Sequence, residues 1–369
     1  MIKKQGNKQV ALTIFHNNHH EVAKNFCNEF INASPEKRYV FGINNYAERI
    51  ADKLDIAAFI DDFTTNTEHM GKPILKTSDI PSDGLVISTL LGKPLTAKRV
   101  LSDASINFLD FFSFYSYSGL DLGNVRFWSD FNKEFKTNRN HYEEIYDRLI
   151  DDESKDVFSR IINFRLTADL SYMDGFSDRE RFQYFEPFLN LKKSNEVFVD
   201  VGGFDGHTSL EFIKTCPDYK AIYFFEPEEK NMLVAKENLM DHSNVHLMQK
   251  GLSDNKATVS FSAGGSISAI TEDGDYEIEV DTLDQIVSEK VSFIKMDIEG
   301  AESSAIEGAR KTIYRDLPTM ALCVYHYPDD LWKIASQVFS IRDHYDIYLR
   351  HYTEGVTETV MFFIPRQSS

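Results

Sequence analysis

The stretch VFVDVGGFDGHTSLEF, residues 197–212, decides how the second half of the chain folds. β-forming residues surround Asp200, so its first five positions predict a strand. Three glycines follow within five residues, and a helix is expected from about His207. Such a turn costs folding entropy, and a ligand that needs close approach to the backbone is a reason to keep it. In open α/β sheets, ligands bind at these carboxyl ends of strands.

The residues beyond this turn alternate between strand and helix patterns. Further strands are predicted at 221–225, 245–249, 291–296, 320–325, 346–352 and 358–364, with helices at 228–240, 282–290, 302–314 and 330–340 and a hairpin-like insertion at 257–280. This alternation predicts a parallel sheet with helices on both faces. The last two strands are joined by TEGV, which leaves no room for a helical crossover, so they form an antiparallel hairpin at one edge.

Three regions are expected along the chain. Residues 1–100 contain a strand, turn, helix and strand pattern that predicts a small Rossmann-like α/β domain. Residues 101–190 show aromatic and charged residues at helical spacing and predict a helical connector, whose aromatic run 108–117 is assigned to a core rather than to a lid. Residues 191–369 form the domain with the alternating pattern.

Composition and charge exclude several classes of function. The chain has 369 residues, of which 42% are hydrophobic and 27% charged, as in soluble globular proteins. A net charge of −18 argues against nucleic acid as a partner. Three cysteines without CxxC pairing indicate neither disulfides nor zinc, which fits a reducing cytoplasm. The apolar run 10–15 is too short for a signal sequence, and no run is long enough to span a bilayer.

The acidic residues of the glycine turn indicate the kind of ligand. The spacing D-x-G-G-x-D-G differs from the dinucleotide pattern, and its carboxylates repel a pyrophosphate but suit a cation such as S-adenosylmethionine. Glu226 ends the second strand, placed to accept hydrogen bonds from both ribose hydroxyls. The third strand ends in GLSD, so Ser253 or Asp254 is expected at the adenine edge. The remaining predicted cofactor-binding residues are Asp200, Gly202, Gly203, Asp205 and Gly206.

Over about residues 183–365, several stretches together carry a family resemblance. They are VFVDVGGFDGHTS, FFEPEEKN, GLSDN, VDTLDQI, IKMDIEGAE, YHYPDDLW and YLRHY…ETVMFFIP. Together they resemble the FkbM-type family of S-adenosylmethionine-dependent methyltransferases. The resemblance implies a seven-stranded class I methyltransferase sheet and methyl transfer, mostly to oxygen. It also implies that Asp200, Gly202 and Glu226 contact the cofactor and that Asp297 lies beside the transferring methyl group.

Two candidate catalytic residues follow neighbouring strands. Asp297 ends the fourth strand and His326 ends the fifth, so both are expected over the methyl group. A hydroxyl is a poor nucleophile until a base takes its proton. His326 is the preferred base, because an unperturbed imidazole pKa of about 6.5 lies near working pH. A structural histidine remains the alternative, and Asp297 is either a catalytic group or a contact to cofactor or substrate.

Glu299 and Glu302 follow Asp297 closely and raise the possibility of a divalent metal, since oxygen ligands suit magnesium as in catechol-type methyltransferases. Glu302 equally fits the first turn of a helix, where its carboxylate faces the helix dipole. No metal ligand is therefore assigned. Lys295 either points toward the cleft or caps the sheet edge.

The N-terminal domain gives a weaker signal. In GINNYA, Asn44 replaces the second glycine of the dinucleotide pattern, although Asp61 or Asp62 resembles the ribose-binding acid. A scaffold or substrate-recognition role is favoured over nucleotide binding. The domain resembles nucleotide-binding-like domains fused to some glycan-modifying enzymes, which favours sugar acceptors by analogy.

The leading hypothesis is a cytoplasmic S-adenosylmethionine-dependent O-methyltransferase that acts on a hydroxyl of a sugar or glycan precursor. The alternatives are a nicotinamide-dependent oxidoreductase with two Rossmann-like units and a non-catalytic nucleotide-binding scaffold. The expected partner is a small-molecule or glycan acceptor. The sequence does not predict the oligomeric state.

Overall fold

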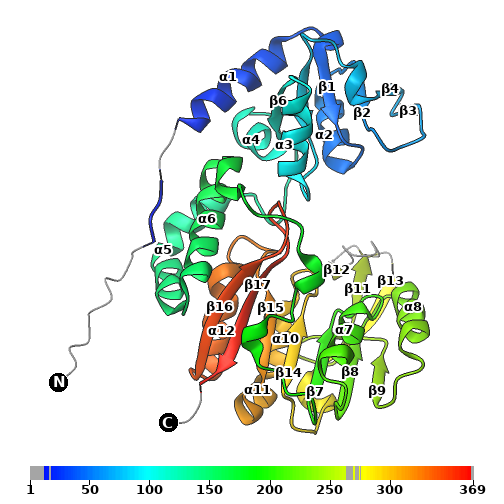
Figure 1. The fold of residues 1–369 in the computed structure, drawn as a ribbon, viewed down its shortest axis with the longest axis vertical. Coiled ribbons are helices and arrows are strands. Elements are labelled where there is room, and N and C mark those ends of the chain that lie inside the picture. Colours follow the sequence, from blue (N-terminus) through cyan, green and yellow to red (C-terminus); the bar gives the residue numbers. More distant parts are fainter. Residues whose placement is uncertain (1–11, 16–17, 263–268, 271–273, 275, 367–369) are drawn as a thin grey trace, which may run out of the picture.

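The computed structural model describes residues 12–15, 18–262, 269–270, 274 and 276–366. It contains two large β-sheets and the helices that flank them (Figure 1). The larger helices are α1 (His19–Asn32), α2 (Asn45–Lys53), α3 (Pro94–Asp103), α4 (Phe111–Tyr117), α5 (Phe131–Arg148), α6 (Asp152–Thr167), α7 (His207–Thr215), α8 (Glu229–Leu239), α9 (Leu283–Ile286), α10 (Glu302–Gly308), α11 (Arg310–Asp316) and α12 (Asp330–Ile341). Part of the predicted insertion at 257–280 lies outside the described residues.

The N-terminal sheet has six strands in the order β3-β4-β2-β1-β5-β6. Its strands are β1 (Arg38–Phe41), β2 (Ala58–Ile60), β3 (Glu68–His69), β4 (Lys72–Leu75), β5 (Leu85–Ser88) and β6 (Asn107–Asp110). All neighbours are parallel except β3 and β4. The last strand therefore extends beyond residue 100, the expected end of the first domain, and the domain boundaries stay a prediction.

The C-terminal sheet has seven strands in the order β16-β17-β15-β14-β7-β8-β9. They are β7 (Val197–Val201), β8 (Ala221–Phe225), β9 (Val245–Met248), β14 (Phe293–Met296), β15 (Thr319–Cys323), β16 (Tyr345–His351) and β17 (Thr359–Pro365). The first five are parallel, and β17 pairs antiparallel with both β15 and β16. This confirms the predicted α/β sheet and its terminal hairpin.

A small third sheet follows β9. Its strands are β10 (Gly251–Leu252), β11 (Ala257–Ser262), β12 (Ala269–Ile270) and β13 (Tyr276–Asp281). The order is β10-β13-β11-β12, with β11 antiparallel to β13 as expected for a hairpin-like insertion.

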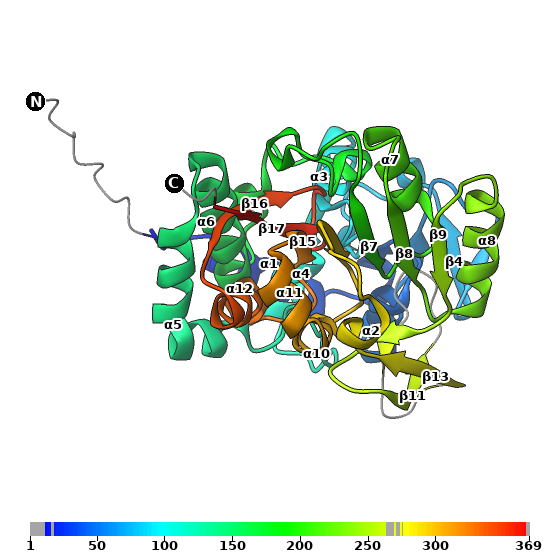
Figure 2. The ribbon, with the colours of Figure 1, turned by 90° about the horizontal axis from the view of Figure 1, so that it is seen from below.

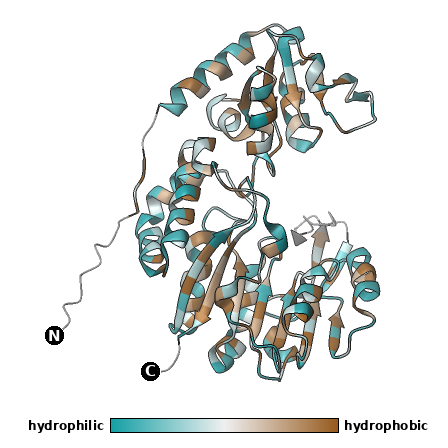
Figure 3. Cartoon of the chain, viewed as in Figure 1, coloured by the Kyte–Doolittle hydropathy of each residue, from teal (hydrophilic) through white to brown (hydrophobic). Residues whose placement is uncertain are grey.

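Two hydrophobic cores cover the faces of the C-terminal sheet. One joins Phe198 and Phe293 to residues of α7 and α8, and the other joins Val199 and Ile294 to α10, α11 and α12. Figure 2 shows α7 on one side of the strands and α10 and α11 on the other, and Figure 3 shows hydrophobic residues concentrated on the strands. The alternation of side chains along each strand thus supplies both cores.

Two predicted helices are shorter than expected. The helix predicted at 302–314 is divided into α10 and α11 at Ala309, whose backbone angles of φ −105° and ψ 5° depart from helical values. The helix predicted at 282–290 is one turn, since the extended residue Val287 is buried in the core. Among the described residues, no helix combines the length and the hydropathy that a membrane span requires.

Candidate functional site

A cavity of about 540 Å³ lies at the carboxyl ends of β7, β8 and β14. This is the end of the sheet where the glycine turn follows β7, and the volume is in the range of small-molecule sites. Residues from several separate stretches of the chain line it, among them Gln183, Tyr184, Gly202, Gly203, Phe204, Asp205, Glu226, Gly251, Leu252, Lys295, Asp297, Glu299, Tyr325 and Glu358.

The glycines of the turn are required by protein packing. A Cβ at Gly202 would lie 1.9 Å from the Asp297 carbonyl oxygen, and one at Gly203 would lie 2.0 Å from the ring of Phe224. Gly202 and Gly206 also have φ values of +73° and +86°, which favour glycine. Gly202 and Gly203 still line the cavity, whereas Gly206 does not line it and precedes α7. The turn therefore brings the ends of β7 and β14 together beside the cavity.

Asp200 is not exposed to the cavity, which corrects its expected role as a direct cofactor contact. Its side chain is fully buried, accepts a hydrogen bond from Ser209 at 2.7 Å, and lies 3.5 Å from Lys295 Nζ. Lys295 also donates to the Gly202 carbonyl oxygen at 2.5 Å, so it points toward the site rather than to the sheet edge. Burial alone would lower the pKa of Lys295, but Asp200 and Asp297 raise it. The buried Asp200–Lys295 pair therefore stabilises the glycine turn through the hydrogen bond from Lys295 to Gly202.

Glu226 lies at the cavity wall, as predicted. Its carboxylate accepts backbone N–H groups from Phe204 at 3.0 Å and Glu228 at 2.8 Å. Burial raises its pKa, although these hydrogen bonds oppose the shift. A carboxylate has about four acceptor positions, so two backbone bonds leave capacity for a ligand's hydroxyls.

Ser253 and Asp254 do not line the cavity, contrary to the expected contact with adenine. The chain turns away after β10, where the Ser253 N–H bonds to the Asp281 carbonyl and its own carbonyl packs against Gly308. Gly251 and Leu252, two residues earlier, line the cavity instead. Asp205 lines it too, while its carboxylate accepts the backbone N–H of His207.

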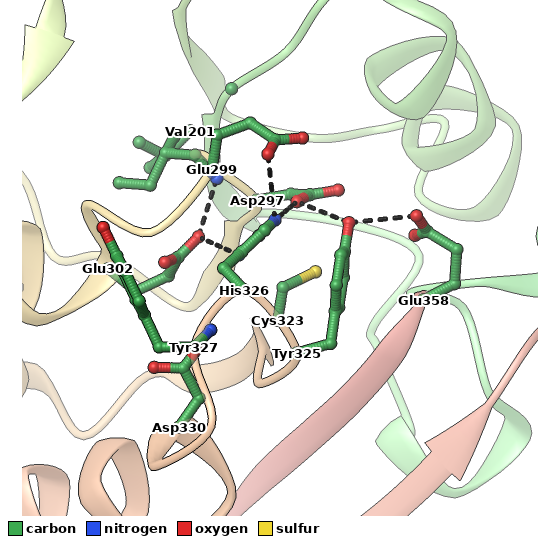
Figure 4. A network of polar contacts seen from close by, with 12 residues as sticks. Val201, Asp297, Glu299, Glu302, Cys323, Tyr325, His326, Tyr327, Asp330 and Glu358 are labelled. Carbon is green, nitrogen blue, oxygen red and sulfur yellow. Dashed lines mark hydrogen bonds and ion pairs between the residues drawn. The ribbon is translucent and has the colours of Figure 1, made fainter. Parts of the chain in front are cut away.

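Asp297 joins a buried network that sequence reasoning missed (Figure 4). It accepts hydrogen bonds from Tyr184 at 2.8 Å and Tyr325 at 3.3 Å, and the Tyr325 hydroxyl also lies 2.9 Å from Glu358. Gln183 donates to Glu358 at 2.6 Å. Burial opposes ionisation of Asp297, but Lys295, His326 and the Tyr184 hydrogen bond hold its pKa below its ordinary value.

Glu358 has the opposite shift. Burial first, and the nearby Asp297 charge second, raise its pKa to about 7. Glu358 lies in the loop between β16 and β17, and Tyr184 lies in the segment that precedes β7. Neither Glu358 nor Tyr184 belongs to a sequence motif that would mark it as a site residue. For Glu358, the predicted terminal hairpin was the one feature that could have indicated a position near Asp297.

His326 and Asp297 come together as predicted, but the charge state of His326 does not suit a base. Its Nε2 lies 3.4 Å from Asp297 and 3.7 Å from Glu299, and its Nδ1 lies 3.1 Å from Glu302 (Figure 4). Burial lowers the pKa of His326, yet the three carboxylates more than offset it and raise the pKa to about 10. A protonated imidazole cannot accept a proton, so the argument from an unperturbed pKa is wrong.

The other parts of the chain reach this site directly. Arg126 donates to the Glu299 carboxylate at 2.8 Å and to its backbone carbonyl at 2.9 Å. Thr96 in α3 donates to Glu354, in the turn of the terminal hairpin, through both its N–H and its hydroxyl at 2.7 Å. Arg126, between α4 and α5, and Thr96, in α3, therefore each hold a loop that carries a residue of the cavity lining, Glu299 in one and Glu358 in the other.

The candidate nucleotide-binding residues of the N-terminal unit have structural partners. Asn44 caps α2 by accepting the N–H groups of Tyr46 and Ala47. Asp61 accepts two backbone N–H groups in its own turn, and Asp62 bonds to Thr77. These contacts explain the residues without a nucleotide and agree with the favoured scaffold role, which stays a prediction.

Comparison with known proteins agrees with this geometry. Residues 200–353 match the family model described as "Methyltransferase FkbM domain". A curated relative, "2-O-methyltransferase NoeI" from Sinorhizobium fredii, is 26% identical over 149 residues, and the match covers 33% of this chain and 61% of the relative, less than two thirds of its length.

A solved structure has the same fold over nearly the whole chain. It is the crystal structure of methyltransferase FkbM from Methylobacillus flagellatus KT, with a TM-score of 0.75 and 23% identity over 95% of this chain and 94% of that one. The matched residues include the glycine turn, Glu226, Asp297 and His326. Residues 200–353 are therefore similar to the FkbM methyltransferase domain, and the chain has the fold of a solved FkbM methyltransferase.

Proposed function

We propose that the protein is an S-adenosylmethionine-dependent O-methyltransferase that acts on a hydroxyl of a sugar or glycan precursor. The proposal rests on one observation: the glycine turn, Glu226 and Asp297 line the same cavity, although each follows a different strand. The family match and the relative named as a 2-O-methyltransferase support it.

The donor chemistry of the cavity fits this cofactor. The cavity lining is rich in carboxylates, among them those of Glu226, Asp297, Glu299 and Glu358. Carboxylates favour a sulfonium cation and ribose hydroxyls, and they disfavour the pyrophosphate of a nicotinamide dinucleotide. We assign Glu226 to the ribose and the backbone at Gly251 and Leu252 to the adenine. When bound, the cofactor supplies an activated methyl group on a positively charged sulfur.

The chain's own residues align the acceptor and remove its proton. Asp297, ionised because its pKa is lowered, faces the region of the cavity where positive charge is expected. Alignment of two bound reactants contributes about 7–11 kcal/mol to lowering a barrier. Glu358, with its pKa of about 7, replaces His326 as the base. The Tyr325 hydroxyl lies between the two carboxylates, 2.9 Å from Glu358 and 3.3 Å from Asp297, and its single proton is donated to one of them at a time.

Calorimetry tests the cofactor assignment. We expect S-adenosylmethionine to bind the purified chain and NAD not to bind. Glu226→Gln should weaken binding by about 10- to 100-fold, because it replaces a charged acceptor whose hydrogen bonds are worth about 1.5–3 kcal/mol. Glu237→Gln, an exposed position on α8, is the matched control and should bind as the wild type does. Binding of NAD but not of S-adenosylmethionine would refute the proposal.

A labelled cofactor tests the reaction. Incubation with bacterial saccharide extracts, followed by mass spectrometry, should reveal a methylated sugar hydroxyl. With that acceptor, Glu358→Gln should lower kcat by about 10²- to 10⁴-fold, the usual contribution of a general base. Loss of activity in His326→Gln with full activity in Glu358→Gln would exclude Glu358 as the base.

A further inference from the structure

The His326 cluster, defined by His326, Asp297, Glu299 and Glu302, adjoins the cavity, which Asp297 and Glu299 line; Figure 4 shows the four side chains together. The imidazole is 2% exposed and Glu302 is 1% exposed, so water does not solvate their charges. Three carboxylates converge on one ring, from the loop after β14 and the start of α10. This is an unusual concentration of buried charge, and neither the cofactor nor the proposed base explains it.

The ring nitrogens of His326 are not satisfied by hydrogen bonds. Across the residues that the structure describes, neither Nδ1 nor Nε2 has a hydrogen-bond partner of acceptable geometry, although carboxylate oxygens lie 3.1–3.7 Å away. A buried polar group left without a hydrogen bond costs about 1–3 kcal/mol. The ring is therefore close to three carboxylates without being well bonded to any of them.

The donor atoms are spaced for a shared cation. One donor atom from each of Asp297, Glu302 and His326 lies within 4.8 Å of the other two. A six-coordinate ion with bonds of about 2.1 Å holds its ligand atoms roughly 3.0–4.2 Å apart, so small side-chain movements close the site. If Nδ1 coordinates, Nε2 keeps Glu299 as a carboxylate neighbour at 3.7 Å, the arrangement that orients metal-binding histidines.

Charge also favours a cation at this position. Arg126 pairs with Glu299 and Lys295 with Asp200, so among the described side chains the His326 ring is the basic group within 4 Å of both Asp297 and Glu302. A buried carboxylate without a partner is costly. Asp297 and Glu299 line the cavity, which gives an ion a route from solvent.

We propose that Asp297, Glu302 and His326 bind a divalent cation, with Glu299 at its edge. The set of two carboxylates and one imidazole suits first-row ions such as Mn²⁺ better than a purely oxygen-liganded Mg²⁺ site. The ion takes the place of the imidazole proton between the carboxylates. The site departs from the expectation that no residue is a metal ligand, and it does not depend on the proposed cofactor.

Binding of Mn²⁺ to the full chain, after EDTA treatment and without S-adenosylmethionine, tests the site. Electron paramagnetic resonance counts free Mn²⁺ during a titration, and we expect one bound ion per chain. His326→Gln and Glu302→Gln should each weaken binding by at least about tenfold, as losses at metal sites commonly do. Glu307→Gln, an exposed residue of the same helix that pairs with Arg310, is the control and should bind as the wild type does.

Equal Mn²⁺ binding by the wild type and His326→Gln, including no binding by either, overturns the proposal. If the variants do not fold, pulsed resonance on the wild type decides: coupling of Mn²⁺ to an imidazole nitrogen supports the site, and its absence overturns it. Calorimetry with S-adenosylmethionine in EDTA is run separately. Failure of the metal site and failure of the proposed cofactor are thus observed in different experiments.

Discussion

Replacing Lys295 with methionine tests whether the glycine turn is supported by a buried ion pair. Lys295 is 3% exposed and Asp200 is fully buried, and Nζ lies 3.5 Å from Oδ1. Asp200 Oδ1 has no hydrogen-bond partner among the described residues, so the lysine charge is its main compensation. The variant keeps most of the length of the side chain but leaves that carboxylate uncompensated.

The expected loss is about 3–5 kcal/mol of unfolding free energy, the usual cost of removing one partner of a buried pair. Coulomb's law at an effective dielectric constant of about 20 gives roughly 5 kcal/mol for unit charges at this separation, the same order. The double variant Asp200→Asn, Lys295→Met removes both charges and keeps an acceptor for Ser209. It should therefore be more stable than Lys295→Met alone.

Urea unfolding followed by far-ultraviolet circular dichroism measures these differences through the midpoint and the slope. Lys290→Met, an exposed lysine just before β14, is the matched control and should change stability by less than about 0.5 kcal/mol. The reasoning is refuted if Lys295→Met lies within about 1 kcal/mol of the wild type. It is also refuted if the double variant is no more stable than the single one.

Three further predictions follow from single residues. Gly202→Ala should weaken S-adenosylmethionine binding by more than tenfold in calorimetry, because its Cβ would lie 1.9 Å from the Asp297 carbonyl oxygen; Gly92→Ala, with no atom within 4 Å of its Cβ, should not. Glu358→Gln should stabilise the protein at pH 8 but not at pH 4. The folded pKa of about 7 lies above the ordinary glutamate pKa of 4.5, so the wild type loses stability as pH rises between these values, by up to about 3 kcal/mol in thermal unfolding. Asn44→Ala should cost about 1 kcal/mol through loss of the α2 cap, with cofactor affinity unchanged; a loss of affinity would instead link this helix to the site.

Much of the site's location could be predicted from local sequence. The glycine turn, Glu226 and Asp297 each end a strand, and parallel strands bring such ends to one edge of a sheet. The same rule placed His326 near Asp297. It did not predict which side chains face the cavity: Asp200 points into the protein, and Ser253 and Asp254 follow a chain that has already turned away.

The alternating strands and helices, the antiparallel hairpin and the turn that begins the site could all be inferred from local sequence, because they depend on the spacing of apolar residues and on glycine. The folded chain was needed to show that Tyr184 contacts Asp297, that Tyr325 links Asp297 to Glu358, and that three carboxylates surround His326. Charge states depend on burial and on neighbours brought from distant segments. For that reason the raised pKa of His326 could not be predicted from an isolated imidazole, and the carboxylate with a pKa of about 7 could be identified only in the folded chain.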